Sequence, residues 1–241
     1  MPSLPEQAPR LSLVVPTLQE AAGIEEFLGS LLEAADALGD VETIVVDDAS
    51  SDGTAELARA RLGDRGRVVV RSGPRGLSAS VLEGWRQARG RVLGVMDADG
   101  SHPPALLGEL LAAIEERGAD VALASRYVPG GGTEGWPLRR RLTSALAARL
   151  GRTLVRVRDP MSGFLLFRRE VIEGVDLDPI GWKIALEVLC RGRYDRVEEV
   201  PFVFRDRARG SSKLGARVVG ETLRQCARLR AHLWARGVGR R

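Results

Sequence analysis

The stretch that decides the fold runs from residue 92 to residue 104 and reads Val-Leu-Gly-Val-Met-Asp-Ala-Asp-Gly-Ser-His-Pro-Pro. Its first five residues are apolar and predict a buried strand that ends at two carboxylates, Asp97 and Asp99. Ionised aspartate is rarely buried without a partner, so we expect both to face an open crevice at the strand's carboxyl end. Ligands bind there in open α/β sheets. Carboxylate oxygens on a rigid edge also suit Mg²⁺ or Mn²⁺, with a substrate diphosphate completing the coordination.

The Asp-x-Asp motif also has a simpler interpretation, a helix N-cap followed by a proline-containing turn over residues 99–104. Taken alone, the motif favours that interpretation, and only the remainder of the chain favours a ligand site. His102, which follows the motif, is expected to make a cap or turn hydrogen bond rather than to bind metal.

Short apolar runs alternate with helical patterns through the first half of the chain. Strands are expected at residues 10–16, 41–47, 67–71, 91–96 and 120–125, and helices at 21–38, 53–61, 77–89 and 103–116. The strand runs are rich in Val, Ile or Leu without strict polar alternation, as strands covered on both faces should be. The sequence therefore predicts an α/β fold with a mostly parallel sheet and helices on both faces.

The second half is less regular and has no internal repeat. We expect a mobile loop at 130–132, helices at 138–154 and 183–191, and strands at 163–168 and 196–204. A basic amphipathic helix is expected after Gly215. The simplest organisation is a disordered lead at 1–10, one domain at 11–214 and a basic helical extension at 215–241.

Composition limits the class of protein. Hydrophobic residues make up 44% of the 241 residues, enough for a sizeable core, and the presence of only two cysteines, Cys190 and Cys226, argues against a disulfide framework or zinc site. A reducing, cytoplasmic setting is therefore expected. No apolar run approaches the roughly 18 residues that would span a bilayer, and the first ten residues lack a signal-peptide pattern.

Charge is unevenly distributed. Residues 205–241 contain eleven Lys or Arg and two acids, a net of +9; the whole chain is +4, so residues 1–204 carry −5. A basic tail on an acidic body predicts an anionic partner, which could be a phosphate, a membrane surface or nucleic acid.

More carboxylates follow the first two predicted strands, with Glu20 after one and Asp47, Asp48 and Asp52 after the other. If the strands are parallel, all of these meet the Asp97 motif at one sheet edge, where they would repel each other without cations or hydrogen-bond donors. A nucleotide supplies base and ribose donors, and a divalent metal supplies charge. We assign Asp48 to a ligand, and Asp52 to a turn and helix cap.

These residues carry a resemblance to the family 2 glycosyltransferases, which have the Rossmann-like GT-A fold. The motifs are Pro16-Thr17 with Glu20, Asp47-Asp48 with Ser50, Asp52-Gly53-Thr54, and Asp97-Ala98-Asp99. Downstream motifs narrow the resemblance to the dolichol-phosphate (polyprenol-phosphate) mannose synthases: Ser125-Arg126-Tyr127, residues 159–164, Gly181-Trp182-Lys183-Ile184, residues 199–202 and residues 207–214. The resemblance runs in consistent order from about Leu11 to Leu214.

The resemblance implies roles for individual positions. Asp99, Arg207 and Lys213 would be catalytic, and Asp97, Asp99 and Ser101 would contact the metal. Nucleotide-sugar contacts would come from Pro16, Glu20, Val46, Asp48, Asp97, Ala98, Asp99 and Arg126, and acceptor or phosphate contacts from Arg126, Arg140, Lys183, Arg207 and Lys213. The chain departs from the family pattern at Leu18-Gln19, where relatives usually have Tyr-Asn, and at Ser101, where many have Gln. These departures bear on base packing and on the third metal contact.

The chemistry also follows from physical grounds. Mg²⁺ or Mn²⁺ on Asp99 would neutralise charge that develops on a departing nucleoside diphosphate. A phosphate monoester acceptor is largely dianionic at neutral pH and needs an electrostatic clamp rather than a strong base. Arg207, Arg209 and Lys213 suit that clamp, with flexibility and hydroxyls from residues 210–212; a solvated charged loop is the alternative. Direct displacement at the anomeric carbon would give a β-linked product from an α-linked donor.

The resulting hypothesis is an inverting, metal-dependent transferase that moves mannose from GDP-mannose to a dolichyl or polyprenyl phosphate. Another donor, such as UDP-glucose or UDP-GlcNAc, or a non-lipid acceptor remains the alternative on the same fold. Nucleic acid is not an expected partner, because the basic tail lacks interleaved aromatic residues for base stacking. A nucleotidyltransferase would show an early glycine-rich loop with Arg and Lys, and residues 18–23 contain no such cation.

The tail has two interpretations as well. We expect the C-terminal basic helix to lie in a membrane interface, because a polyprenyl acceptor is held in the bilayer, and this would place the protein in the cytoplasm, peripheral at the inner face of the membrane. The alternative is that the helix packs across the catalytic domain with a cationic face exposed.

Overall fold

The structure is a computed structural model, and it describes residues 8–205 and 216–237. The first half alternates as predicted: β1 (Leu11–Thr17), α1 (Ile24–Leu38), β2 (Val41–Asp47), α2 (Thr54–Leu62), the 3-10 turn η1 (Gly63–Arg65), β3 (Gly66–Val70), α3 (Leu77–Gln87), β4 (Val92–Val95), α4 (Leu106–Glu115) and β5 (Val121–Ser125). The second half contains β6 (Gly132–Thr133), α5 (Leu138–Gly151), β7 (Leu165–Arg168), the 3-10 turn η2 (Arg169–Val171), α6 (Ile184–Arg191), β8 (Val197–Pro201), β9 (Val203–Phe204) and α7 (Ala216–Ala235).

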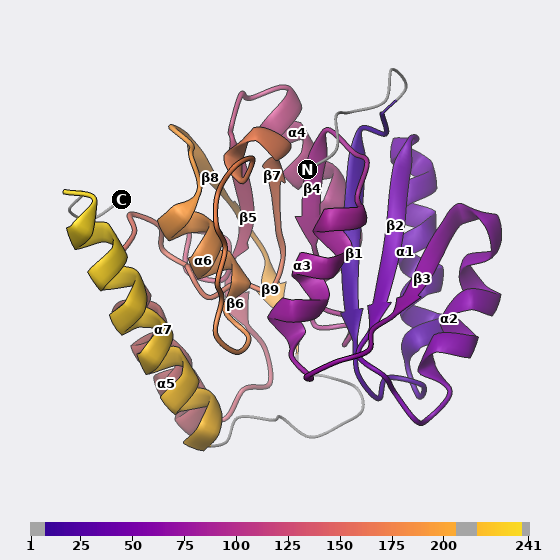
Figure 1. The fold of residues 1–241 in the computed structure, drawn as a ribbon, viewed down its shortest axis with the longest axis horizontal. Coiled ribbons are helices and arrows are strands. Elements are labelled where there is room, and N and C mark those ends of the chain that lie inside the picture. Colours follow the sequence, from indigo (N-terminus) through magenta and orange to yellow (C-terminus); the bar gives the residue numbers. More distant parts are fainter. Residues whose placement is uncertain (1–7, 206–215, 238–241) are drawn as a thin grey trace.

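Seven strands form one sheet in the order β3-β2-β1-β4-β7-β5-β8 (Figure 1). All neighbours are parallel except β7, which runs antiparallel between β4 and β5. The predicted mostly parallel sheet is therefore confirmed. From β1 the chain moves outward to β2 and β3, and then returns to β4 on the other side of β1. Such a reversal of strand order leaves a crevice at the carboxyl ends of β1 and β4, where open α/β sheets bind ligands.

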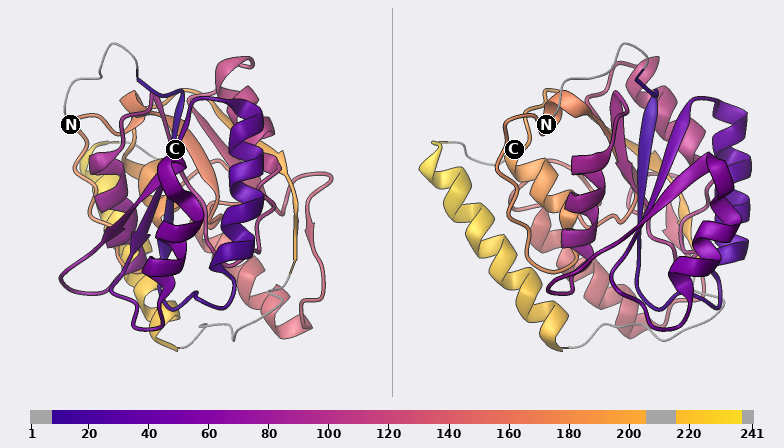
Figure 2. Two further views of the ribbon diagram at one scale, coloured as in Figure 1. Left: turned by 90° about the vertical axis from the view of Figure 1, so that its right-hand side faces the viewer. Right: turned by 45° about the vertical axis from the view of Figure 1, so that its right-hand side comes forward.

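Helices cover both faces of the sheet, as Figure 2 shows from the side. The alternation of side chains along β1 divides the core, because Leu13 and Val15 pack with α1 and α4 whereas Val14 packs with α3. The core cluster on the Val14 side of the sheet also contains α6 residues and Cys226, Leu229 and Leu233 of α7. The C-terminal helix thus shares the core of the domain.

Several details differ from the sequence predictions. The predicted loop at residues 130–132 includes β6, which pairs with β9 in a separate two-stranded sheet, and the single strand predicted at 196–204 is divided into β8 and β9. The described part of the predicted disordered lead lies along the sheet, because the carbonyls of Pro9 and Arg10 accept hydrogen bonds from the N–H groups of Arg91 and Val92. Those residues belong with the sheet rather than with a lead.

Helix α7 packs against α5 and α6 at one side of the molecule (Figure 1). Cys226, Leu229 and Leu233 are buried against the domain, whereas Leu223 and Trp234 are exposed. The helix packs on the domain as the alternative interpretation of the tail described, and its contact with a membrane stays a prediction. Among the helices of residues 8–205 and 216–237, none is long and apolar enough to cross a membrane.

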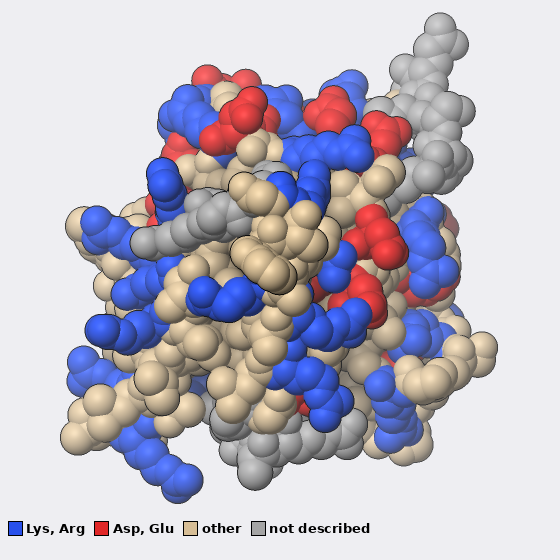
Figure 3. All heavy atoms as spheres, turned by 60° about the vertical axis from the view of Figure 1, so that its left-hand side comes forward, with Lys and Arg blue, Asp and Glu red and all other residues tan. Residues whose placement is uncertain are grey.

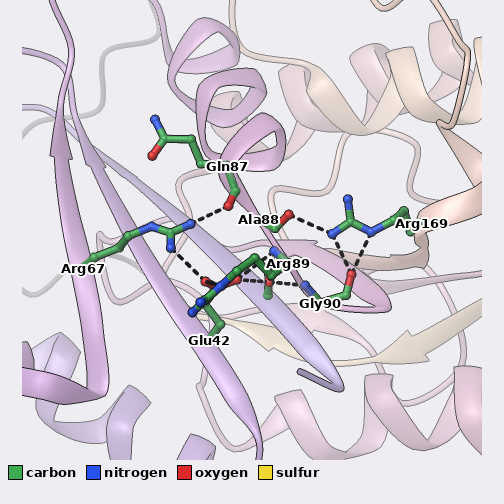
Figure 4. A network of polar contacts seen from close by, with 8 residues as sticks. Glu42, Arg67, Gln87, Ala88, Arg89, Gly90 and Arg169 are labelled. Carbon is green, nitrogen blue, oxygen red and sulfur yellow. Dashed lines mark hydrogen bonds and ion pairs between the residues drawn. The ribbon is translucent and has the colours of Figure 1, made fainter. Parts of the chain in front are cut away.

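A polar network closes the amino end of the sheet (Figure 4). Glu42 of β2 is buried and has four donors: Ser12 Oγ, Arg67 Nη1, and the backbone N–H and Nε of Arg89. Arg169 is buried beside it and donates to the carbonyls of Ala88 and Gly90 at 2.7–2.9 Å. The charges of Glu42 and Arg169 thereby have partners within the protein.

Candidate functional site

Two cavities open at the carboxyl edge of the sheet. The first, here called the acidic cavity, has a volume of about 480 Å³ and is lined by Pro16, Thr17, Leu18, Glu20, Asp48, Arg75, Gly76, Leu77, Ser80, Asp97, Ala98, Asp99, Gly181, Trp182, Val218 and Glu221. The second, the basic cavity, has a volume of about 270 Å³ and includes Arg126, Trp136, Arg140, Lys183 and Phe204 in its lining. Asp97 and Asp99 line both cavities. The two aspartates therefore stand where two spaces of different character meet.

The parallel strands bring the acidic cavity together. The N–H of Asp48 donates to the Thr17 carbonyl at 2.9 Å, which joins the ends of β2 and β1. Asp47 is fully buried and accepts from Thr17 Oγ1 at 2.9 Å, and from the backbone and hydroxyl of Ser50. The Asp47 carboxylate is thus engaged in hydrogen bonds within the turn, and Asp48 is the residue of this pair that lines the cavity.

Asp48 is held from the opposite side. Its Oδ1 pairs with Arg71 at the end of β3, and its Oδ2 accepts from the Gly76 N–H at 2.7 Å. Arg75, from the same connection, lines the cavity and donates to the carbonyl of Ala49 at 3.1 Å. The β3–α3 connection is therefore fastened over the acidic cavity, and the Arg71 guanidinium compensates the Asp48 charge.

Asp52 has the role that the sequence assigned to it. Its carboxylate accepts from the backbone N–H groups of Ala21 at 3.0 Å and Thr54 at 3.1 Å, next to the start of α2. Although burial alone would raise it, the hydrogen bond from the Thr54 hydroxyl, together with the two backbone hydrogen bonds, holds the pKa of Asp52 below its ordinary value. Asp52 fixes the entry to α2 and lines neither cavity.

The loop after β4 arranges Asp97 and Asp99. A Cβ placed on Gly163 would lie 2.1 Å from Asp97 Oδ2, so only glycine lets this carboxylate rest against the chain. Asp99 Oδ1 accepts from the N–H of Ser101 at 3.0 Å and also from its hydroxyl. Ser101 therefore orients Asp99. The sequence analysis assigned Ser101 to the metal and did not predict this contact.

His102 is buried among aromatic rings. Its ring stacks on Phe202 at 5.0 Å between centroids and contacts Phe164 and Phe204 edge-on. Its Nδ1 lies 3.2 Å from Ser101 Oγ. Burial lowers the pKa of His102 to about 4, with the Asp99 carboxylate opposing the shift, so the ring is neutral at physiological pH. The ring acts as packing behind the Ser101–Asp99 contact.

Arg126 enters the basic cavity from the end of β5. Its Nε and Nη2 each lie 2.7 Å from an oxygen of Asp159, a bidentate pair, and Asp159 is completely buried. Although burial alone would lower it, the hydrogen bonds and charge of Asp159 hold the pKa of Arg126 above its ordinary value. The Arg126 guanidinium is therefore fixed in position and always charged.

Arg140, from the first turn of α5, lies on an aromatic floor. Its guanidinium carbon is 4.1 Å from the centroid of Trp136, whose ring contacts Phe204 edge-on at 4.9 Å. Cations over aromatic faces are attracted by the ring quadrupole. The floor keeps Arg140 at the basic cavity without neutralising its charge.

Lys183 precedes α6 and completes the cations of this cavity in the described residues. Burial lowers the pKa of Lys183, as does the charge of Arg126, while Asp97 and Asp159 oppose the shift. The Lys183 ammonium thus has an electrostatic interaction with Asp97, which links the basic side of the site to the shared carboxylates.

A divalent metal fits the two shared aspartates only with help from a ligand. Within residues 8–205 and 216–237, no group of three or more His, Cys, Asp or Glu side chains is arranged to hold a metal ion. Mg²⁺ commonly uses one or two carboxylates together with substrate phosphates, which is the donor set that Asp97 and Asp99 would offer at the junction of the cavities. The residues present therefore fit a metal that arrives with a diphosphate.

The structure brings most predicted site residues to these cavities. Pro16, Glu20, Asp48, Asp97, Ala98 and Asp99 line the acidic cavity, and Ser101, Arg126, Arg140 and Lys183 line the basic cavity. Val46 is different: its side chain is fully buried in the core and lines neither cavity. The predicted phosphate clamp of Arg207 and Lys213 lies outside the described residues.

Other residues of the site were not singled out from the sequence. Asp159 and Trp182 lie inside motifs that the resemblance quoted, but no role was assigned to them. Arg71 at the end of a predicted strand could have been suspected as a counter-ion for Asp48. Trp136 carries no sequence signal, because only the fold places it under Arg140.

The class of protein follows from this arrangement. A Rossmann-like sheet with an Asp-x-Asp motif at its carboxyl edge, between an acidic cavity and a basic one, defines a glycosyltransferase with the GT-A fold. Comparison with known proteins identifies the family: the pattern of glycosyl transferase family 2 matches residues 12–175, and the chain belongs to this family.

Curated relatives extend the match over most of the chain. This chain is 43% identical over 225 residues to a dolichol-phosphate mannosyltransferase of Pyrococcus furiosus, with 91% of this chain and 63% of that protein covered. It is 36% identical to the dolichol-phosphate mannosyltransferase of Saccharomyces cerevisiae, covering 90% of this chain and 86% of the relative. It is 38% identical to the polyprenol monophosphomannose synthase of Mycolicibacterium smegmatis, covering 89% and 84%. The chain thus spans less than two thirds of the Pyrococcus protein and most of the other two.

Solved structures share the fold. Glucosyl-3-phosphoglycerate synthase from Mycobacterium tuberculosis, crystallised with Mn²⁺, uridine diphosphate and glucosyl-3-phosphoglycerate, superposes with a TM-score of 0.68 at 23% identity, covering 95% of this chain and 81% of that one. The mannosyltransferase PcManGT from Pyrobaculum calidifontis, in complex with GDP-Man and Mn²⁺, gives a TM-score of 0.64 at 21% identity, covering 93% and 66%. At these identities the similarity shows the fold alone.

Proposed function

We propose that this enzyme transfers mannose from GDP-mannose to a dolichyl or polyprenyl phosphate, with inversion at the anomeric carbon, to give a β-linked polyprenyl-phosphate mannose. The observation that carries the proposal is the sharing of Asp97 and Asp99 by the acidic and basic cavities. A sugar diphosphate bridging this junction would put its anomeric carbon between the two spaces. The relatives named as mannosyltransferases of lipid phosphates support the choice of substrates.

The acidic cavity suits the nucleotide. The Asp48 carboxylate can accept hydrogen bonds from a base, and Glu20 can accept them from hydroxyl groups, so this end would recognise the nucleoside by its donors. Pro16 and Ala98 add apolar contact. Guanine offers ring and amino N–H donors to a carboxylate, which supports GDP-mannose.

The basic cavity suits the acceptor phosphate. Arg126, Arg140 and Lys183 converge on it, and a phosphate monoester, dianionic near neutral pH, already carries its nucleophilic oxygen. These cations would offset repulsion between that phosphate and the donor's diphosphate, so no general base is needed. Attack from this side on the face opposite the departing diphosphate gives inversion. Arg207 and Lys213 are proposed to complete the clamp.

Mg²⁺ or Mn²⁺ is the proposed cofactor, held by Asp97 and Asp99. Such an ion, when bound, supplies positive charge that stabilises the leaving diphosphate. Ser101 is proposed as a third metal contact: its hydroxyl donates its proton to Asp99, which leaves the oxygen lone pairs to face the ion.

We also propose that the protein works on the cytoplasmic, inner face of a membrane. Exposed Arg139, Arg141 and Arg149 of α5 and Arg224, Arg228 and Arg230 of α7 lie on adjoining helices, together with the exposed side chains of Leu138, Leu142, Leu146 and Leu223. In Figure 3, basic and uncharged side chains dominate the left part of this face, and acidic ones gather at the top and right. Mixed arginine and leucine surfaces suit anionic lipid headgroups.

A donor panel tests the proposal. The purified protein with Mn²⁺ or Mg²⁺ is given a short-chain polyprenyl phosphate and GDP-mannose, UDP-glucose or UDP-GlcNAc, and products are detected by mass. We expect transfer from GDP-mannose and a product whose one-bond coupling between C1 and H1 shows the β configuration. Transfer only to an acceptor without phosphate, or only from a uridine donor, would refute it and favour the alternative on the same fold.

The acceptor clamp has its own test. Arg207→Ala should raise KM for the polyprenyl phosphate more than KM for GDP-mannose, because Arg207 is assigned to the acceptor side. Arg193→Ala, which removes an exposed arginine after α6, serves as the matched control. The opposite pattern of KM changes would move Arg207 to the donor side.

A further inference from the structure

Helix α7 is part of both cavities. Val218 lines both of them, Glu221 lines the acidic cavity, and Thr222 and Leu223 line the basic cavity. Since α7 closes the described chain and lies outside the residues that match the family pattern, its side chains were not candidates from the sequence motifs. How α7 is seated therefore bears on the shape of the site.

The segment Gly181-Trp182-Lys183, here called the wall, contributes lining residues to both cavities. Gly181 and Trp182 line the acidic cavity, whereas Trp182 and Lys183 line the basic cavity. From one side, Ser78 Oγ of α3 donates to the Gly181 carbonyl at 2.6 Å. From the other side, Glu221 of α7 lies so close that a Cβ on Gly181 would be 2.8 Å from its Oε2, and the φ of +71° at Gly181 also favours glycine.

Gln225 fastens α7 to this wall. Its side chain is almost completely buried, and its Nε2 donates to the carbonyl of Lys183 at 3.1 Å and to Glu187 Oε2 at 3.3 Å. Glu187 is itself buried and is held by the Asp178 N–H at 2.9 Å and by Arg191, whose Nε is 2.6 Å from Oε1. A buried polar group that loses its partner is costly, so this junction resists movement of α7 relative to Lys183.

We propose that Gln225 is a positioning residue of the transferase: by holding the Lys183 carbonyl, it couples the seating of α7 to the placement of the Lys183 ammonium in the basic cavity. The inference rests on the proposed role of Lys183 toward the acceptor phosphate. A displaced α7 would release the wall at Lys183 and withdraw the cation from the cavity. Gln225 itself touches no substrate.

Kinetics of Gln225→Leu test the coupling. Leucine is similar in size to glutamine, but its apolar side chain cannot donate to the Lys183 carbonyl. We expect kcat/KM for the lipid phosphate to fall about tenfold, equivalent to about 1.4 kcal/mol, while the affinity for GDP by calorimetry changes by less than about twofold. Gln87→Leu, the same substitution at an exposed glutamine of α3, should leave both quantities unchanged.

A double-mutant cycle separates positioning from general damage. If Gln225 acts through Lys183, adding Gln225→Leu to Lys183→Ala should cause no further loss. Losses that multiply in the double variant, or equal losses toward donor and acceptor, would overturn the proposal. If Gln225→Leu does not fold, Gln225→Met, which has a similar length and no hydrogen-bond donor, takes its place, and the same outcomes apply to it.

A spectroscopic readout keeps this inference distinct from the proposed function. The chain has only two lysines, Lys183 and Lys213, so protein labelled with ¹³Cε-lysine gives two assignable side-chain signals. Gln225→Leu should shift the Lys183 signal and leave the Lys213 signal in place, and Gln87→Leu should move neither. An unmoved Lys183 signal in folded Gln225→Leu refutes the positioning role. A shifted signal in an enzyme that does not transfer mannose to a lipid phosphate refutes only the proposed function.

Discussion

The charged side chains at the two ends of the central sheet differ in their surroundings. At the amino end, Glu42 and Arg169 are buried, and their hydrogen-bonding groups are occupied by the protein itself (Figure 4). At the carboxyl end, Asp97, Asp99 and Lys183 line cavities, where a ligand can add to the contacts that these groups make within the protein. Both ends are built from the same parallel strands, so the fold alone does not explain the difference.

The comparison teaches which charges serve stability and which serve binding. A charge whose partners all belong to the folded chain contributes to the free energy of unfolding, because its hydrogen bonds are lost when the chain unfolds. A charge that lines a cavity can gain a further partner when a ligand binds, so removing it should cost more activity than stability. Substitutions at the two ends should therefore have separable effects.

The largest expected effect is at the open end. Asp99→Asn keeps the shape of the side chain but removes a charge from the proposed metal and diphosphate site, so kcat should fall about 10³-fold, on the scale of losing one electrostatic contact in a transition state. The urea midpoint should stay within error of the parent protein. Asp64→Asn, at an exposed aspartate of η1, is the control and should alter neither. Activity that survives in Asp99→Asn would remove Asp99 from the metal site.

The second effect is at the closed end. Glu42→Gln leaves Arg67 and Arg89 without their carboxylate, and we expect a loss of about 2 kcal/mol in the free energy of unfolding, since these arginines remain partly solvated. Urea unfolding followed by circular dichroism measures it. The affinity for GDP should not change; a large loss of GDP affinity in the folded variant would show that the two ends are not independent.

The pH dependence of stability sharpens this contrast. Although burial alone would raise it, hydrogen bonds from Ser12 and Arg89 and the charge of Arg67 hold the pKa of Glu42 below its ordinary value of 4.5. A carboxyl with a lowered pKa in the folded state stabilises above its unfolded pKa and loses that contribution as pH falls through the folded value. The difference in urea midpoint between the parent and Glu42→Gln should thus be constant near neutral pH and shrink in acid below about pH 4. A difference that grows in acid would contradict the assignment.

The smallest effect concerns the aromatic floor of the basic cavity. Trp136→Leu should remove the cation–π contact with Arg140, which is worth about 1 kcal/mol, and raise KM for the acceptor phosphate about fivefold. Trp136→Phe retains an aromatic face and should recover most of that loss. Equal effects of the two substitutions would indicate that Trp136 contributes only volume.

How much of this could be predicted depends on the range of the interactions involved. The strands, the helices of the first half and the carboxylates at the strand ends follow from local patterns, because apolar runs and turn residues report the backbone directly. The antiparallel β7, the β6–β9 pair and the burial of Val46 depend on which strands become neighbours, and no local pattern encodes that choice. Asp159 illustrates the limit, since it is 33 residues from Arg126 in the chain and meets it only through the fold.

The amino-acid sequence by itself determined the α/β class, the acidic edge after β1, β2 and β4, and the family, because each depends on residue types at fixed short spacings. Only the tertiary structure decided that the same edge carries two cavities, that Arg71 neutralises Asp48 whereas Asp97 and Asp99 stay at the junction, and that α7 closes the wall at Lys183. The physical reason is that electrostatic and hydrogen-bond partners act over a few ångströms in space, and those distances exist only once the chain has folded.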